Sequence, residues 1–143
     1  MEMAMSYRGR SLQPSEAVAR LRTARHIAPE GDVLRFFKDA LDVYRESLAI
    51  QREIARISAA TEVALTQVRE KHGIYREALG LIFEERREAI AKHFDIIDQG
   101  IARNDHDLML RGLQGVGAIV AASPFANLKD LAQILEGDQP LEF

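Results

Sequence analysis

The four histidines are the residues best suited to metal or proton chemistry in this sequence. Helical di-iron proteins use Glu-x-x-His pairs. The residues three positions before the four histidines are not acidic: they are Thr23, Arg69, Ile90 and Arg103. The spacings His-x-x-x-His and His-Glu-x-x-His are also missing. We therefore expect no dedicated metal site, and nothing in the sequence indicates a cofactor.

The densest acidic cluster is Glu84, Glu85 and Glu88. Paired carboxylates can act as a general acid and a general base when they line a cleft. Here Glu84 lies three residues before Arg87, and Glu88 lies four residues before Lys92. These are the spacings of ion pairs on one helix face. We expect a solvated charged face at this cluster and no catalysis.

His72 and His93 fall on or beside an apolar stripe. Histidines there could act as protonation switches near neutral pH. The simpler prediction is two half-buried side chains at helix contacts.

Three glycines, Gly112, Gly115 and Gly117, lie close together without the preceding strand that a phosphate-binding loop requires. Glycines are costly inside a helix. Their spacing therefore predicts a helix that packs closely against a neighbour.

The charge of the chain shifts from basic to acidic along its length. Residues 1–31 carry five arginines against three glutamates, and residues 105–143 carry two bases against six acids. A basic arm can contact nucleic-acid phosphates or an anionic membrane. The candidate anion contacts are Arg8, Arg10, Arg20, Arg22 and Arg25. Without a nucleic-acid-binding motif, the simpler prediction is a solvated, mobile arm over residues 1–31, which could contain a short helix from Ser15 to about His26.

Composition narrows the class of protein. The chain has 143 residues, a net charge of −3, 47% hydrophobic residues and 6% aromatic residues, which predicts a mainly aliphatic core. Without cysteine it can form no disulfide and no thiolate nucleophile. The N-terminus lacks a signal-peptide pattern, and no apolar run approaches the roughly 20 residues of a spanning helix. We expect a cytoplasmic protein.

The positions of the prolines predict where the helices that carry these residues can run. None occurs in the 94 residues between Pro29 and Pro124, and helix interiors exclude proline. Apolar residues over 32–104 recur in steps of four and three, which favours one long, coiled-coil-like amphipathic helix with Asp32 as its N-cap. The alternative is a helical hairpin that turns at Lys71, His72 and Gly73.

The apolar stripe of a single long helix would need cover from another molecule. The sequence therefore predicts a homo-oligomer. The candidate interface residues are Phe37, Leu41, Tyr44, Leu48, Ile54, Leu65 and Val68.

Two short helices are expected over residues 105–137, packing on residues 75–103. Asn104 or Asp105 would cap the first of them, and Ser123 with Pro124 would begin the second. Residues 138–143 form an acidic tail. The candidate surface for a partner is Phe125, Leu128, Leu131 and Phe143.

The segment Ile119-Val-Ala-Ala-Ser-Pro-Phe125, with Leu128, Leu131 and the Glu142-Phe143 ending, resembles a group of small uncharacterised bacterial proteins. These have a long charged helix before a Ser-Pro-Phe segment and a short acidic tail. The resemblance implies a bacterial or phage-associated origin and brings no activity or site.

Together these patterns predict an all-α protein with a long coiled-coil-like helix followed by a small C-terminal helical bundle. We expect a non-enzymatic scaffold or adaptor that self-associates through the long helix and presents a helical surface to an unidentified protein partner. The alternative is an accessory protein that binds nucleic acid or a membrane surface through its basic arm.

Overall fold

The computed structural model describes residues 13–49 and 59–136, and in these ranges the chain is all-α. The α-helices are α2 (Pro14–Thr23), α3 (Glu30–Ala49), α4 (Ala59–Ile82), α5 (Arg87–Arg103), α6 (His106–Ala121) and α7 (Leu128–Glu136). Short 3-10 helices join some of them: η1 (Ala24–His26), η2 (Glu84–Arg86) and η3 (Pro124–Ala126). The described residues contain no strand.

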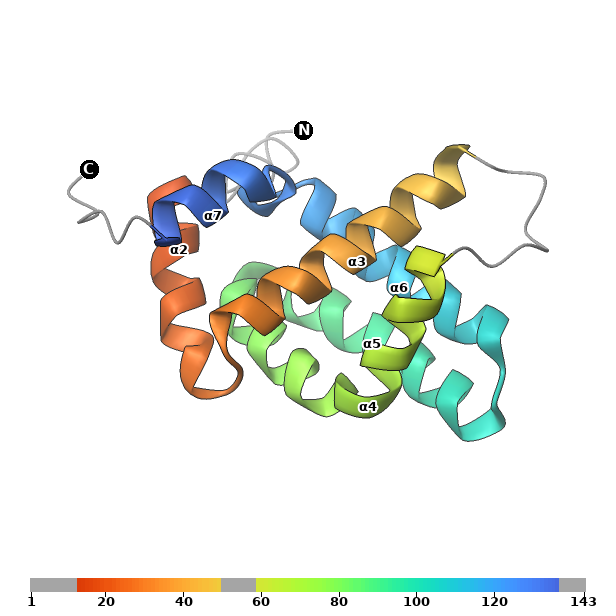
Figure 1. The fold of residues 1–143 in the computed structure, drawn as a ribbon. Coiled ribbons are helices and arrows are strands. Elements are labelled where there is room, and N and C mark those ends of the chain that lie inside the picture. Colours follow the sequence, from red (N-terminus) through yellow and green to blue (C-terminus); the bar gives the residue numbers. More distant parts are fainter. Residues whose placement is uncertain (1–12, 50–58, 137–143) are drawn as a thin grey trace, which may run out of the picture.

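Four of the helices form the body of the molecule. Helix α3 packs against α4 and α6, and α5 packs against the same two helices, so the four enclose one core (Figure 1). Helix α2 contacts α4, and α7 contacts α3. Both lie on the side of the molecule where α3 begins (Figure 1).

The core is more aromatic than the composition predicts. Phe36 stacks on Tyr75 with ring centroids 4.2 Å apart. Phe37, Phe83 and Phe125 form a second cluster, with centroids 5.0 to 5.9 Å apart. The few aromatic residues therefore concentrate where α3, η3 and the end of α4 meet. Each such pair adds about 0.5–1.5 kcal/mol beyond area burial.

The prediction of one helix over residues 32–104 is wrong. Helix α3 begins at Glu30, so Asp32 lies in its first turn and is not its N-cap. It ends at Ala49, and residues 50–58 lie outside the described ranges. Within the described residues the helix breaks at Phe83, whose φ of −109° and ψ of 59° are not helical. The chain reverses there, because doubling back lets one copy bury its own apolar stripe.

The hairpin alternative is closer to the structure but places its turn about ten residues too early. Lys71 does leave the helical region, with φ −128° and ψ 24°, and α4 bends there (Figure 1). Helix α4 nevertheless continues to Ile82. At Lys71 the helix is therefore only kinked, and the chain reverses its direction at residues 83–86.

The C-terminal third forms α6 and α7, and α6 packs on α5 through its glycines. A Cβ on Gly112 would lie 2.7 Å from the carbonyl oxygen of His93, and one on Gly115 would overlap the His93 ring. Gly117 instead faces α3, where a Cβ would overlap the carbonyl oxygen of Ala40. Sequence reasoning expected the contact with α5 but missed the contact with α3.

Candidate binding groove between α4 and α5

Most residues of the predicted oligomer interface lie inside the single chain. Phe37, Leu41, Leu65 and Val68 are at most 6% exposed. Tyr44 is half-buried, and Ile54 lies outside the described residues. Leu48 remains exposed, at 58%. One copy therefore covers the stripe, and self-association no longer follows from its burial.

The predicted anion contacts are also partly engaged. The guanidinium of Arg20 donates to the Ile82 carbonyl at 3.0 Å, to Glu85 at 2.7 Å and to Glu16 at 3.0 Å. Arg22 is half-buried, and Arg25 is largely exposed. Arg8 and Arg10 lie outside the described ranges. Arg20 thus holds α2 against the end of α4 and is not available to an anion.

The predicted partner surface is largely internal. Phe125 is fully buried and Leu131 is 4% exposed. Leu128 is half-buried, and Phe143 lies outside the described residues.

The two stripe histidines lie at helix contacts. His72 Nε2 is 3.1 Å from Asp98 Oδ1 on α5. His93 is half-buried against Gly115, and its burial lowers the pKa of its imidazole. In the acidic cluster, Glu85 pairs with Arg20, a residue distant in sequence. Among the described residues, no group of three or more acidic or histidine side chains could hold a metal ion.

Asp39 on α3 is the only buried charged side chain in the described ranges, at 6% exposure. Its Oδ2 atom has no hydrogen-bond partner there. Burial raises the pKa of this carboxyl group. Asp39 lines neither of the two hollows described below, and an unpaired buried carboxylate lowers the stability of the fold.

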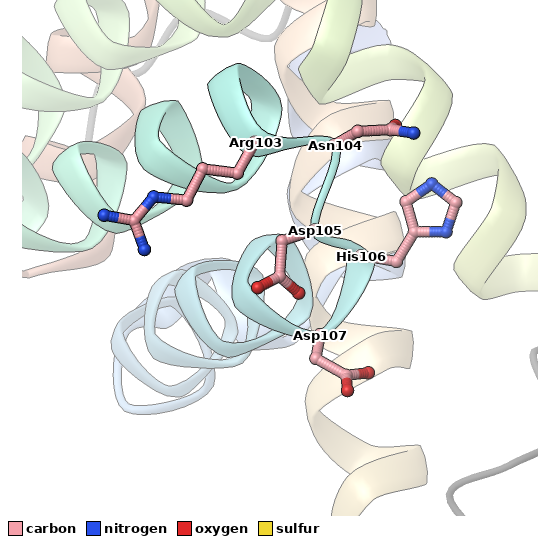
Figure 2. Close-up of a pocket in the computed structure, with 5 residues that line it drawn as sticks. All are labelled: Arg103, Asn104, Asp105, His106 and Asp107. Atoms are coloured by element: carbon pink, nitrogen blue, oxygen red, sulfur yellow. The ribbon is translucent and has the colours of Figure 1, made fainter.

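The turn between α5 and α6 forms an open hollow of about 360 Å³. Its side chains do not converge: Arg103 points one way, while Asn104 and His106 point the other (Figure 2). Asn104 takes the left-handed conformation that ends α5, and the Asp105 carboxylate accepts from the Leu108 amide to cap α6. His106 Nε2 lies 3.1 Å from Arg69 on α4. These residues stabilise the turn between α5 and α6, and nothing in their geometry favours binding of a ligand.

A larger groove of about 570 Å³ lies between η1, α4 and α5. This volume is in the range that binding pockets occupy. The apolar residues that line it are Ile27, Gly80, Leu81, Ile90 and Ala91. The polar ones are His26, Arg76, Glu77 and Arg87. The groove therefore has an apolar floor with charged side chains around it.

Helical spacing brings these residues together. On α4 they fall at positions 76, 77, 80 and 81, and on α5 at 87, 90 and 91, so each set shares one helix face. The two helices run antiparallel, because Arg76 pairs with Asp95 at 2.9 Å while His72 pairs with Asp98. The reversal at residues 83–86 thus creates the groove.

Sequence reasoning did not find this groove. Its positions span three elements, and their contact depends on a turn that the sequence did not predict. The one available indication was Gly80, a glycine in a helical stretch without a capping role. A Cβ there would meet only Arg87, at 3.8 Å.

Comparison of the chain with protein-family models, curated proteins and solved structures finds no match. No helix of the described residues has both the length and the apolar character needed to cross a bilayer.

Proposed function

We propose that this protein is a non-enzymatic adaptor that binds a segment of a partner protein in the groove between η1, α4 and α5. The observation that supports the proposal is the groove itself, with an apolar floor and charged walls at one face of the bundle. Binding sites in proteins combine these same two features, since apolar area supplies affinity and a few polar groups supply orientation.

The groove walls are firmly held, which favours binding without large rearrangement. Ile90 is 1% exposed, and Arg76 is fastened to Asp95 and Asp98 of α5 at 2.9 and 3.5 Å. A surface fixed in advance loses little conformational entropy when a partner docks.

Site-specific photo-crosslinking in the source cell tests this proposal. One variant carries the crosslinker at Ala91 in the groove, and the matched control carries it at Ile74 on α4, which is 43% exposed and does not line the groove. We expect a partner that is labelled from Ala91 and not from Ile74.

The captured partner is then purified and titrated against the full chain. Leu81→Asp should weaken the affinity at least about tenfold, because a half-buried leucine contributes roughly 1.5 kcal/mol or more to an apolar contact. Ile74→Asp should leave the affinity unchanged, and thermal melts establish that both variants are folded. Ala91→Lys serves as a second groove variant if Leu81→Asp is unstable. Equal labelling from the two crosslinker positions, or wild-type affinity in both groove variants, would refute the proposal.

A further inference from the structure

The groove has walls of different charge. Arg76 binds two carboxylates of α5, and Gly80, one turn later, lies beside Arg87 of α5. Positions 76 and 80 therefore form the row of α4 that faces α5. Glu77 and Leu81 follow these positions by one residue, about 100° further around the helix axis. They form the next row, away from α5.

Two groove charges of opposite sign lack an ion-pair partner among residues 13–49 and 59–136. Arg87, on the α5 side, and Glu77, on the other row, are both exposed, and neither takes part in an ion pair there. The Arg76 charge is neutralised by Asp95 and Asp98. An occupant that complements the groove thus needs an acid on one edge and a base on the other.

The shape of the groove favours a helix as its occupant. Its two long walls are antiparallel helices, and a third helix packs against such a pair by placing its ridges in their groove. The Arg87 side chain lies against Gly80, and Ala91 carries only a methyl group, so an incoming helix can approach most closely beside Ala91. The described residues include no strand, so an extended segment could not bind here by adding to a sheet edge.

We infer that the groove binds an amphipathic helix of a partner protein that carries charges of both signs. The apolar stripe of this helix rests on Leu81 and Ile90. An acidic side chain on one edge of the stripe meets Arg87, and a basic side chain on the other edge meets Glu77. This inference rests on the proposed function, since it names the class of partner for the same groove.

A phage-displayed library of helical peptides with randomised surface positions tests the inference. The library is selected on the full chain and depleted on the Leu81→Asp variant, so only peptides that need the groove remain. We expect the enriched sequences to share an apolar stripe flanked by an acid on one edge and a base on the other. A random linear peptide library is selected in parallel.

Charge reversal then assigns the edges. Arg87→Glu should weaken a selected synthetic peptide about two- to five-fold, the size of one exposed ion pair, and Glu77→Lys should do the same. Exchanging the peptide's acid for lysine should restore binding to Arg87→Glu. Arg111→Glu is the matched control, because Arg111 is exposed on α6 and does not line the groove.

The outcomes separate the two proposals. Enrichment of proline-containing linear peptides, or of helices that bind both reversal variants as tightly as the wild type, would overturn the helix inference and leave the groove as a binding site. If neither library yields a peptide that prefers the wild-type chain to Leu81→Asp, the proposed function fails together with the inference.

Discussion

Replacing Gly117 with alanine tests the close contact between α3 and α6. Gly117 of α6 faces α3, and a Cβ there would overlap the carbonyl oxygen of Ala40 and lie 2.6 Å from the Cβ of Tyr44. A backbone carbonyl and a Cβ cannot rotate away as the end of a side chain can. The new methyl group therefore fits only if α3 and α6 move apart.

Two effects of opposite sign determine how much Gly117→Ala changes the free energy of unfolding. Alanine is about 1 kcal/mol more favourable than glycine within a helix. Overpacking a tight contact costs about 1–3 kcal/mol, and the rigid neighbours place this site at the upper end. The free energy of unfolding should therefore fall by about 2 kcal/mol, which lowers the melting temperature by about 6–10 °C in a chain of this size.

Urea unfolding followed by circular dichroism measures this loss, with Gly73→Ala as the matched control. A Cβ on Gly73 would meet nothing within 4 Å. That substitution should raise the free energy of unfolding by about 0.5–1 kcal/mol through the unfolded-state entropy that glycine adds. If Gly117→Ala is as stable as the wild type, or if both substitutions have the same sign, the close approach of α3 and α6 is incorrect.

Three further predictions concern side chains that fasten or strain the bundle. Arg20→Met should lower the free energy of unfolding by about 1 kcal/mol, because it removes the hydrogen bonds from α2 to Ile82 and Glu85. The control Arg25→Met should change the free energy of unfolding by less than about 0.5 kcal/mol, since Arg25 is largely exposed. Urea unfolding measures both variants. Asp39→Asn should raise stability near pH 7 by about 1 kcal/mol, and the gain should vanish in acid, as measured by urea titration against pH. The wild type should lose stability through His93 as the pH falls below about 6.5, and His93→Gln should remove this contribution. An unchanged pH profile would contradict this.

The two pH predictions have opposite signs because burial disfavours the charged form of each group, which raises the pKa of the Asp39 carboxyl and lowers the pKa of the His93 imidazole. The raised pKa of Asp39 means that the folded state binds a proton more tightly than the unfolded state, so stability is lost as the pH rises through the folded pKa. The lowered pKa of His93 means the reverse, so stability is lost as the pH falls below the unfolded value.

Local features of the chain could be predicted because they depend on residues close in sequence. The Asp105 carboxylate caps α6, where Asn104 or Asp105 was expected to do so, and Ser123 caps η3 just before Pro124. The helix expected to begin at Pro124 is there only the 3-10 helix η3, and α7 begins at Leu128. The spacing of Gly112 and Gly115 indicated a close helix neighbour, and His93 of α5 is that neighbour. The all-α class followed from the lack of proline between Pro29 and Pro124 and from the helical period of the apolar residues.

The sequence by itself determined which side of each helix is buried, and only the tertiary structure decided what buries it. An apolar stripe such as Phe37, Leu41 and Val68 gives the same sequence pattern in two cases: when a second copy of the chain buries it, and when the same chain folds back over it. The reversal at residues 83–86 contains no Gly, Pro, Asn or Asp that would mark a turn in the sequence, and the Phe83 ring packs there against Phe37 and Phe125, which are distant in sequence. The groove depends on that reversal, so it could appear only once α4 and α5 lay side by side.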